Sequence, residues 1–190
     1  MAKAAVDAGA RFIVAPGFNP RTVSWCIENQ VPVFPGIATP SDLEMALEHG
    51  LEVLKFFPAE ALGGVKTLKA LSAPYHTLRF IPTGGIGPGN LLAYLQLPCV
   101  LACGGSWMVK PELLASGAWD EVTRLTAEAL ALGLADEVVG DDEILDRACA
   151  LAATYAAGPR VAIRAAKRAI DEGIGMSLAD GVDLELDLFL

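Results

Sequence analysis

The run Val53-Leu54-Lys55-Phe56-Phe57-Pro58 is apolar except for one lysine. If the run is a buried strand, alternation places Lys55 and Phe57 on one face and Leu54 and Phe56 on the other. An unpaired ammonium on such a face is costly, so a lysine there tends to lose its proton and become a nucleophile. A Schiff-base lysine needs this state to attack a carbonyl. The alternative is a lysine at a strand end, whose amine reaches water or a carboxylate.

Five short β-rich runs recur along the chain, and each has glycine or proline at or next to its end: residues 11–17, 31–37, 53–58, 79–85 and 100–105. The segments between them predict helices over residues 19–29, 41–49, 64–71 and 88–95. Runs this apolar and β-branched predict strands covered on both faces, as in parallel sheets. Repeated βα units indicate either a doubly wound sheet or a (β/α) barrel. Five strands are too few to close an eight-stranded barrel.

Helix end signals support this order and predict a helical tail. Ser41 followed by Glu44 predicts a capping box, and Gly50 ends the same helix. After about residue 134 the strands stop and three helices are expected, one capped by Asp141, one opened by Gly158-Pro159 and one capped by Ser177. The first of these helices carries an apolar face made of Ile144, Leu145, Ala148, Cys149, Leu151, Ala152 and Tyr155.

The charge distribution predicts where the two parts meet. Residues 1–133 carry nine Lys or Arg against eleven Asp or Glu, a net charge of −2. Residues 134–190 carry five against twelve, a net charge of −7. This shift indicates a boundary near Gly133, with one domain over residues 1–132 and a helical segment over residues 133–190.

Composition excludes several classes of partner. A net charge of −9 argues against nucleic acid or an anionic membrane. No apolar stretch is long enough to span a membrane, and no basic-then-apolar signal opens the chain, so we expect a cytoplasmic protein. The cysteines form no CxxC pair and lack histidines at ligand spacing, which predicts small buried thiols and no metal site: Cys26, Cys99, Cys103 and Cys149.

Two glycine-rich segments follow the last two β-rich runs, Thr83-Gly84-Gly85-Ile86 and Gly104-Gly105-Ser106-Trp107. In barrel enzymes, loops of this kind bind phosphate, because glycine lets backbone N–H groups approach the anion. Ser106 could donate its hydroxyl to the same group. The alternative is a pair of tight turns in which glycine is needed only for positive φ. Two such loops downstream of an apolar-strand lysine favour the phosphate interpretation.

These motifs resemble a known family over residues from about 5 to 130. The matching segments are Val14-Ala15-Pro16-Gly17, Phe34-Pro35-Gly36-Ile37-Ala38-Thr39, Leu54-Lys55-Phe56-Phe57-Pro58-Ala59-Glu60, Phe80-Ile81-Pro82-Thr83-Gly84-Gly85-Ile86 and Gly104-Gly105-Ser106-Trp107. They look like 2-keto-3-deoxy-6-phosphogluconate (KDPG) aldolase, bifunctional with 4-hydroxy-2-oxoglutarate aldolase. The resemblance implies a class I aldolase, usually trimeric, on a (β/α)8 barrel, of which this chain would hold five βα units, strands 4–8, followed by an all-α tail.

The resemblance also implies roles for individual residues. Lys55 would form the Schiff base with pyruvate, Thr83 would hold the pyruvyl carboxylate, and Phe57 would line the pocket. The substrate phosphate would lie in a cradle of Gly84, Gly85, Gly105 and Ser106. Pro16 and Pro35 would lie at strand ends around the pocket mouth. The reaction would cleave a phosphorylated keto acid, KDPG, to pyruvate and glyceraldehyde 3-phosphate without a metal or an organic cofactor.

The family pattern includes three further strands, the second of which carries a proton-shuttling glutamate and a carboxylate-binding arginine without counterparts here. Glu60 is the first acid after Lys55 in sequence, but its place beyond Pro58 indicates a loop cap. Loss of a positioned acid–base group typically costs about 10²–10⁴-fold in rate. Impaired turnover is therefore expected, and a non-catalytic module that binds phosphate or keto acid is the alternative.

The tail resembles a second family. Gly133-Leu134-Ala135-Asp136-Glu137-Val138-Val139, Ala157-Gly158-Pro159 and Ala165-Ala166-Lys167-Arg168-Ala169-Ile170 look like the C-terminal helices of enoyl-CoA hydratase/isomerase (crotonase) proteins. The resemblance implies a role in trimer packing beside an acyl-CoA site, and no catalytic residue. A crotonase-type partner or fusion is thus a third possible function. Arg164, Lys167 and Arg168 could touch a CoA phosphate, although a solvated helix face is the simpler interpretation.

Overall fold

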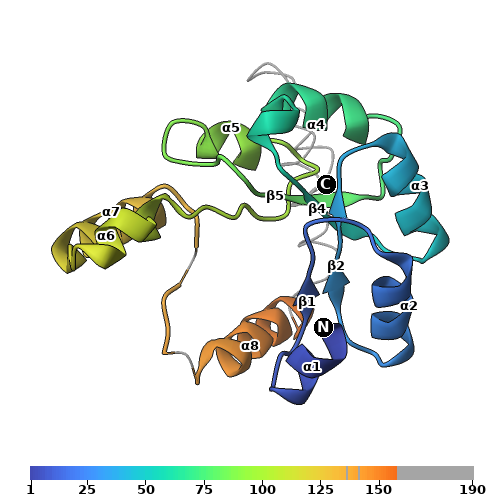
Figure 1. The fold of residues 1–190 in the computed structure, drawn as a ribbon, viewed down its shortest axis with the longest axis horizontal. Helices are drawn as coiled ribbons and strands as arrows, with labels where there is room; N and C mark the ends of the chain where they lie inside the picture. Colours follow the sequence, from blue (N-terminus) through green and yellow to red (C-terminus); the bar gives the residue numbers. More distant parts are fainter. Residues whose placement is uncertain (136, 141, 158–190) are drawn as a thin grey trace. The chain divides into compact units, whose positions relative to one another are not determined.

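The computed structural model describes residues 1–135, 137–140 and 142–157. The chain divides into two compact units, Met1–Ala135 and Asp136–Leu190. The first unit holds all of the described strands, whereas the described part of the second unit contains one helix (Figure 1). The α/β pattern expected for the first part of the chain is therefore confirmed.

The strands of the first unit are parallel and form two sheets, in each of which neighbouring strands follow one another along the chain. The elements are β1 (Ile13–Val14), β2 (Val33–Phe34), β3 (Gly36–Ile37), β4 (Val53–Phe56) and β5 (Arg79–Pro82). β1 pairs with β2, β3 with β4, and β4 with β5. Parallel bridges from Phe80 to Val100 and from Thr83 to Gly104 add a further segment beside β5. All five β-rich runs thus contribute to pairing, in an order that never reverses as a doubly wound sheet would.

Pro35 divides the second run into β2 and β3. Proline has no N–H to donate to a ladder, so the chain can change partners there. Before Pro35 the chain pairs with β1, and after it the chain pairs with β4. The neighbouring Gly36 is required by the close approach of the first run, because a Cβ there would lie 2.1 Å from the carbonyl oxygen of Pro16.

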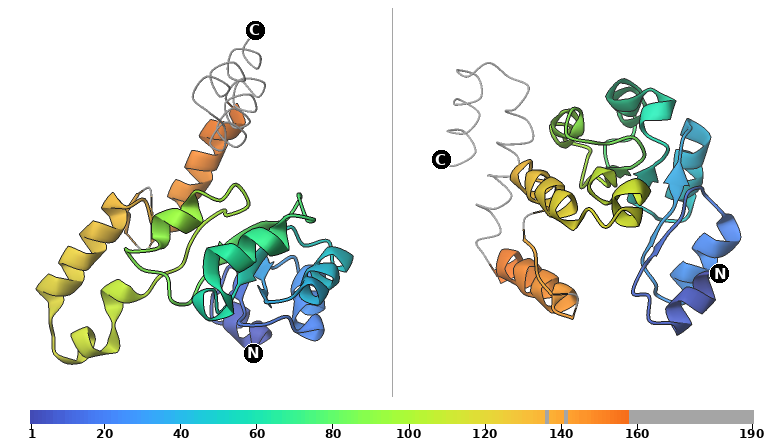
Figure 2. Two further views of the ribbon diagram at one scale, coloured as in Figure 1. Left: turned by 90° about the horizontal axis from the view of Figure 1, so that it is seen from above. Right: turned by 60° about the vertical axis from the view of Figure 1, so that its left-hand side comes forward.

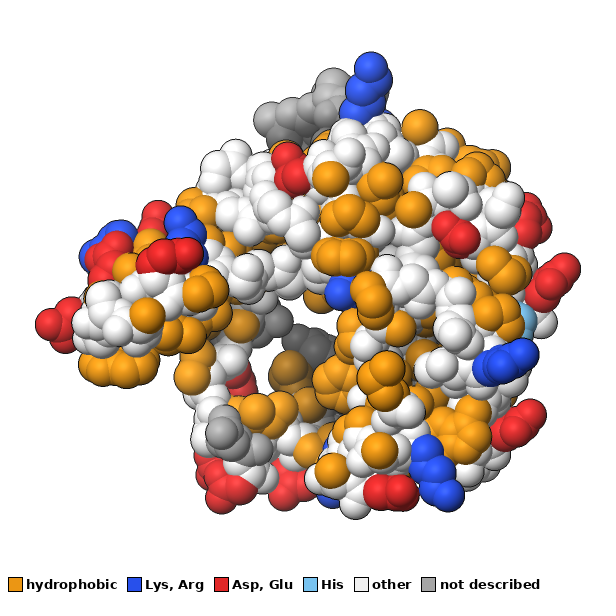
Figure 3. Space-filling model, viewed as in Figure 1, with side chains coloured by type: hydrophobic (Ala, Val, Ile, Leu, Met, Phe, Trp, Pro, Cys, Tyr) orange, Lys and Arg blue, Asp and Glu red, His pale blue; other side chains and the backbone are white. Residues whose placement is uncertain are grey.

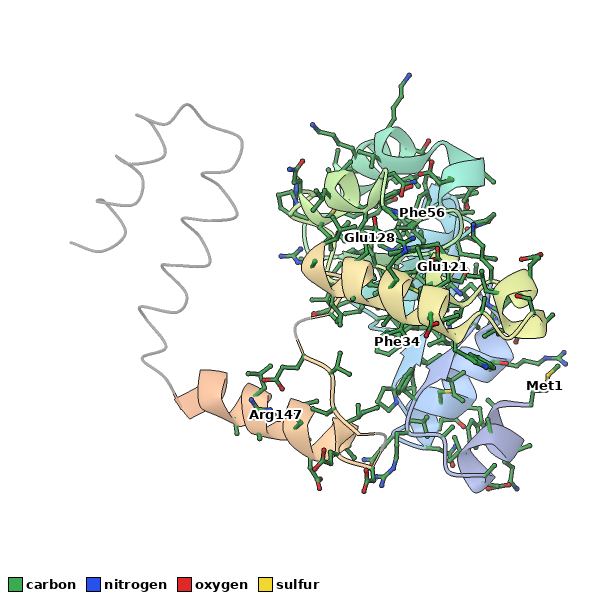
Figure 4. The ribbon with its side chains drawn as sticks, turned by 90° about the vertical axis from the view of Figure 1, so that its left-hand side faces the viewer. Met1, Phe34, Phe56, Glu121, Glu128 and Arg147 are labelled. Carbon is green, nitrogen blue, oxygen red and sulfur yellow. The ribbon has the colours of Figure 1, made fainter. Side chains whose placement is uncertain are left out.

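Strand β4 is buried on one face only. Leu54 and Phe56 are fully buried, whereas Val53 and Lys55 on the opposite face remain partly exposed. Figure 4 places Phe56 inside the first unit among side chains of other elements. The expectation of strands covered on both faces is therefore wrong for β4, because in the described residues the covering helices follow one side of the strands (Figures 1 and 2).

The helices between the strands lie close to where the sequence predicts them. They are α2 (Pro20–Glu28), α3 (Pro40–Glu48), α4 (Gly64–Ser72) and α5 (Leu91–Leu95). Their buried side chains pack against the strands in two clusters, a smaller one around Val23, Cys26 and Val33, and a larger one around β4 and β5. Hydrophobic side chains also reach the surface of the first unit (Figure 3), among them Phe12 and Val14.

Helix α3 begins two residues earlier than its predicted capping box. The cap is Thr39, whose Oγ1 accepts a hydrogen bond from the N–H of Asp42, while the Asp42 carboxylate accepts one from the N–H of Thr39. The expected pair, Ser41 and Glu44, is wrong because Pro40 occupies the first helical position, where its missing N–H costs nothing. The expected end is confirmed: Gly50 adopts φ +69° directly after the helix.

The first unit also contains short elements outside the repeated pattern. These are α1 (Ala2–Asp7), η1 (Glu60–Leu62), η2 (Trp107–Val109), α6 (Pro111–Ala115) and α7 (Trp119–Ala131). Helix α7 packs Leu125 and Ala129 against the larger core cluster. On its exposed side, Arg124 pairs with Glu121 at 2.8 Å and Glu128 at 3.7 Å (Figure 4). Exposed pairs of this kind stabilise a helix only slightly.

In the second unit, helix α8 (Ile144–Ala157) confirms the first of the three predicted tail helices. Its expected apolar face is not enclosed, since Ile144 and Leu145 are about half exposed. An ion pair of 2.6 Å joins Arg147 to Glu137. The predicted cap Asp141 and the two later helices lie outside the described residues.

The four cysteines are free thiols, as predicted, but only Cys26 is buried. Cys99 and Cys103 are half-buried and Cys149 is exposed, so the expectation of four buried thiols is wrong. No group of three or more His, Cys, Asp or Glu side chains in the described part of the chain could hold a metal ion. None of the described helices has the length and apolar character needed to cross a membrane.

Candidate active site

A hollow of about 320 Å³ lies where β4, β5 and the segment after them reach their carboxyl ends. Parallel α/β proteins place ligands at this end of their strands. The residues that line the hollow come from the three corresponding segments of the chain: Lys55, Phe57, Thr83, Gly84, Gly85, Ile86, Gly104, Gly105 and Ser106.

Seven of the nine site residues expected from the sequence therefore meet in one place: Lys55, Phe57, Thr83, Gly84, Gly85, Gly105 and Ser106. The other two do not line the hollow. Pro16 is exposed after β1, and Pro35 is buried between β2 and β3. Ile86 and Gly104 line the hollow although they were not named as site residues. Their positions inside the two glycine-rich motifs were the signal that could have found them.

Among the described residues that line the hollow, Lys55 is the one whose side chain can carry a charge. Its Nζ lies 4.5 Å from the centroid of the Phe57 ring. A cation over an aromatic face is attracted by the ring electrons. No ion pair or side-chain hydrogen bond in the described residues engages this amine, and the residue is half-buried. Lys55 is thus neither enclosed in the core nor neutralised by a carboxylate, and its amine is available to a ligand.

The backbone of β4 fixes the position of Lys55. Its N–H donates to the carbonyl oxygen of Pro35 at 2.9 Å, and the next residues pair with β3 and β5 in register. Lys55 lies opposite Gly36 on one neighbouring strand and Ile81 on the other. Because β4 is the middle strand of three, its backbone is held on both sides and the position of the Lys55 Cα is well defined.

Thr83 contributes an unusual polar group to the hollow. Its Oγ1 is buried and has no hydrogen-bond partner among the described residues. A buried hydroxyl without a partner costs about 1–3 kcal/mol, so such a group commonly serves a ligand. The backbone around it is tightly held, since the N–H of Thr83 donates to Phe56 at 3.0 Å and its carbonyl oxygen accepts from Ala59 at 2.8 Å. Gly104 lies so close that a Cβ there would be 2.6 Å from Cγ2 of Thr83.

The two glycine-rich loops present free donors. Gly84 and Gly85 adopt φ values of +96° and +82°, which side chains rarely tolerate. The N–H groups of Gly85, Gly105 and Ser106 make no hydrogen bond within the described part of the chain. Unused backbone N–H groups around a hollow form the kind of concavity that binds anions. In the first loop, Gly85 combines a positive φ with a free donor, whereas Gly105 in the second loop has a free donor without a positive φ.

Glu60, the first acid after Lys55 in sequence, does not line the hollow. It is exposed, and its Oε1 accepts a hydrogen bond of 2.5 Å from the hydroxyl of Tyr94. Burial, together with this hydrogen bond and the Glu60 charge, raises the pKa of Tyr94. Burial also raises the pKa of the nearby Cys103 thiol to about 11. The carboxylate of Glu60 is therefore engaged beside the loops, in agreement with its expected role outside proton transfer.

Residues 1–125 match the family described as KDPG and KHG aldolase. The chain belongs to this aldolase family. One relative, 2-dehydro-3-deoxy-phosphogluconate aldolase of Treponema pallidum, is 51% identical over 131 residues, which are 69% of this chain and 62% of the relative. The chain spans about three fifths of the length of the curated relatives that it matches.

Solved structures of the aldolase family share the fold. The KDPG aldolase of Legionella pneumophila, solved with pyruvate captured as a covalent carbinolamine intermediate, matches with a TM-score of 0.60 and 41% identity over 63% of this chain and 58% of that one. The aldolase of Zymomonas mobilis, solved with 3-phosphoglycerate, matches with a TM-score of 0.60 and 36% identity over 67% of this chain and 59% of that one. The α/β fold with parallel strands is therefore that of KDPG aldolases.

Proposed function

We propose that this chain is a lyase of the class I aldolase type, which cleaves KDPG to pyruvate and glyceraldehyde 3-phosphate through a Schiff base on Lys55. One observation carries the proposal. Lys55, the only ionisable side chain among the described residues that line the hollow, lies in the same 320 Å³ space as two glycine-rich loops with unused N–H donors. That combination suits a substrate with a carbonyl at one end and a phosphate at the other.

In the proposed reaction, the neutral amine of Lys55 attacks the C2 ketone and forms a carbinolamine, which loses water to give a protonated imine. The imine withdraws the electron pair of the C3–C4 bond as the C4 hydroxyl gives up its proton. Glyceraldehyde 3-phosphate leaves, and an enamine remains on Lys55. A proton adds to C3, and water then hydrolyses the imine to release pyruvate and the free amine. The balance requires no metal and no organic cofactor.

The other lining residues orient the substrate in this proposal. The unpartnered hydroxyl of Thr83 donates to the pyruvyl carboxylate, and the Phe57 ring forms an apolar wall beside Lys55. Gly84, Gly85, Gly105 and Ser106 hold the phosphate. Pro16 and Pro35 act from outside the hollow, by fixing the backbone at Gly36 and at Lys55.

We also propose that the parallel segments correspond to strands 4–8 of a (β/α)8 barrel, over residues 1–132. Their unreversed order and the open face of β4 support this, because barrel strands pair in sequence around a shared interior. We further propose a homotrimer, because the family resemblance implies one. Residues 133–190 lie beyond the aldolase match, which ends at residue 125, and for them we propose the crotonase-like helical segment that their sequence resembles.

Proton transfer is the weak step in this site. None of the described residues that line the hollow carries a carboxylate or an imidazole. Without such a group, turnover is expected to be slower by about 10²–10⁴-fold than with one. This observation also favours a second candidate function, in which the hollow binds phosphorylated keto acids without turning them over.

Measuring pyruvate release from KDPG separates the two candidates. Slow release that disappears in Lys55→Met supports the lyase. Formation of a reducible pyruvate adduct on Lys55 without any release from KDPG supports the binding function. Release that survives in Lys55→Met would refute the Schiff-base mechanism. Binding of an acyl-CoA to the chain would instead favour the crotonase-type alternative.

A further inference from the structure

The loop after β5, residues 83–87, is held in place by hydrogen bonds to its carbonyl groups. Three successive carbonyl oxygens each accept a hydrogen bond: Thr83 from the N–H of Ala59 at 2.8 Å, Gly84 from the N–H of Glu60 at 3.1 Å, and Gly85 from the side chain of Asn90 at 3.1 Å. The N–H of Gly85 makes no hydrogen bond in the described part of the chain. The acceptors of the loop are thus occupied while a donor remains free for a ligand.

Asn90 is the one side chain among the described residues that hydrogen-bonds this loop. Its Nδ2 donates to the carbonyl oxygen of Gly85, and its Oδ1 accepts from the N–H of Gly87 at 2.8 Å. The amide therefore spans the turn on both sides of Ile86, a residue that lines the hollow. Asn90 itself does not line the hollow, so any effect on a ligand must pass through the loop.

A second contact holds helix α5, the short helix that begins directly after Asn90. Tyr94 lies one turn further along, and its hydroxyl donates to the carboxylate of Glu60. Glu60 also packs directly against the loop, because a Cβ on Gly85 would lie 2.7 Å from Cβ of Glu60. Helix α5, which begins directly after Asn90, is thus bonded through Tyr94 to Glu60. The N–H of Glu60 in turn donates to the carbonyl oxygen of Gly84.

We propose that Asn90 is a positioning residue that sets the affinity of the hollow for the phosphate of its substrate, with the Tyr94–Glu60 contact holding it in place. The inference rests on the proposed function, because it assumes that the loop receives a phosphate. None of the side-chain hydrogen bonds of Asn90 and Tyr94 within the described residues involves Lys55. Their loss should therefore weaken phosphate recognition while Lys55 still reacts with pyruvate.

The test uses the full chain with Asn90→Ala and Asn90→Ser. Serine is also a favourable residue directly before a helix, but its side chain is too short to bond both Gly85 and Gly87. Asn29→Ala is the matched control, because Asn29 also donates its amide to a carbonyl oxygen, that of Trp25, after helix α2. Calorimetry measures the Kd for 3-phosphoglycerate, with glycerate as the probe without phosphate. Borohydride trapping measures the reaction of Lys55 with pyruvate.

Both Asn90 variants should raise the Kd for 3-phosphoglycerate about fivefold to tenfold, the equivalent of one lost hydrogen bond. Pyruvate trapping, glycerate binding and the Asn29→Ala variant should stay unchanged, and Tyr94→Phe should shift the Kd in the same direction by less. An unchanged Kd in both Asn90 variants would overturn the inference. An equal loss of phosphoglycerate affinity and pyruvate trapping would overturn it too, because the role would then be structural only.

The two proposals fail in different ways. A wild-type chain that binds 3-phosphoglycerate but traps no pyruvate contradicts the Schiff-base function alone, and the fold-change in the Asn90 variants still decides the role of Asn90. A wild-type chain that traps pyruvate but does not bind 3-phosphoglycerate in preference to glycerate overturns the inference about Asn90 and leaves the Schiff-base function standing.

Discussion

The Nζ of Lys55 lies 4.5 Å from the centroid of the Phe57 ring, and both side chains line the same hollow. The two residues are separated by Phe56, which is fully buried on the opposite side. This alternation lets one short stretch of chain supply a core residue, the proposed nucleophile and the aromatic ring beside it. The ring also remains next to any cation formed on Nζ, including the proposed iminium.

Replacing Phe57 should therefore weaken the iminium on Lys55. Phe57→Leu removes a cation–π contact worth about 0.5–1 kcal/mol at a partly exposed site, so the equilibrium yield of pyruvate adduct should fall about twofold to fivefold. Quantitative mass spectrometry after borohydride reduction measures the yield. Phe12→Leu is the control, because Phe12 is exposed and does not line the hollow. An unchanged yield in Phe57→Leu would show that the ring does not stabilise the adduct.

Thr83 should show opposite effects on stability and on ligand binding. Thr83→Val keeps the shape of the side chain and removes a buried hydroxyl that has no partner, so the free energy of unfolding should stay constant or rise by about 1 kcal/mol. Adduct formation with pyruvate should fall, because the hydroxyl that would hold the carboxylate is gone. In the control Thr126→Val, a hydroxyl that donates to Val122 is lost, and stability should not rise. Destabilisation of Thr83→Val by more than the control would contradict this account.

Gly36 should be essential for the pairing of the strands. A Cβ at Gly36 would lie 2.1 Å from the carbonyl oxygen of Pro16, a backbone atom that cannot turn aside. Gly36→Ala should therefore lower the free energy of unfolding by about 2 kcal/mol or more. Gly17→Ala is the matched control, since a Cβ there meets no atom within 4 Å. Urea unfolding of the two variants provides the comparison, and equal stabilities would contradict the predicted clash.

Cys103 should give the protein a pH dependence on the alkaline side. Burial raises the pKa of its thiol from the ordinary 9.0 to about 11, so the unfolded chain releases this proton more readily than the folded one. The resulting contribution to stability is complete below about pH 9 and is lost as the pH rises through about 11. Cys103→Ala should show a smaller loss of unfolding free energy between these pH values than the wild type. The control Cys149→Ala, at an exposed position, should keep the wild-type slope.

The local pattern of the sequence was enough to predict the strands, the helices between them and most of the site. Alternation around Lys55 and the glycine or proline near the end of each β-rich run are short-range signals. The structure confirms the strands that they predict, and it brings seven of the nine expected site residues into one hollow. Pro16 and Pro35 were harder to place, because whether a residue lines a hollow depends on the packing of segments far apart in sequence. Pro35 lies at a strand end in sequence, yet pairing on both sides buries it.

Other features were missed for identifiable physical reasons. The cap of α3 is Thr39 because Pro40 fixes the first helical position. The Ser41–Glu44 pair has the spacing of a capping box too, but it lies two residues further along the chain. The open face of β4 could not be read from composition, because an apolar run looks the same whether one face or both are covered. The hydrogen bond of Tyr94 to Glu60 joins residues 34 positions apart, which no local motif connects. Asn90 bonds Gly85 and Gly87 from a position outside the glycine-rich motif.

The central claim is that Lys55 forms a Schiff base with a keto acid, and one measurement tests it directly. The chain is incubated with pyruvate, reduced with borohydride and digested, and the modified residue is identified by mass spectrometry. Lys66→Met is the control, because it removes a lysine that does not line the hollow. The account predicts a reduced pyruvate adduct on Lys55 in the wild type and in Lys66→Met, and none in Lys55→Met. Absence of the adduct from Lys55 in the wild type would contradict it.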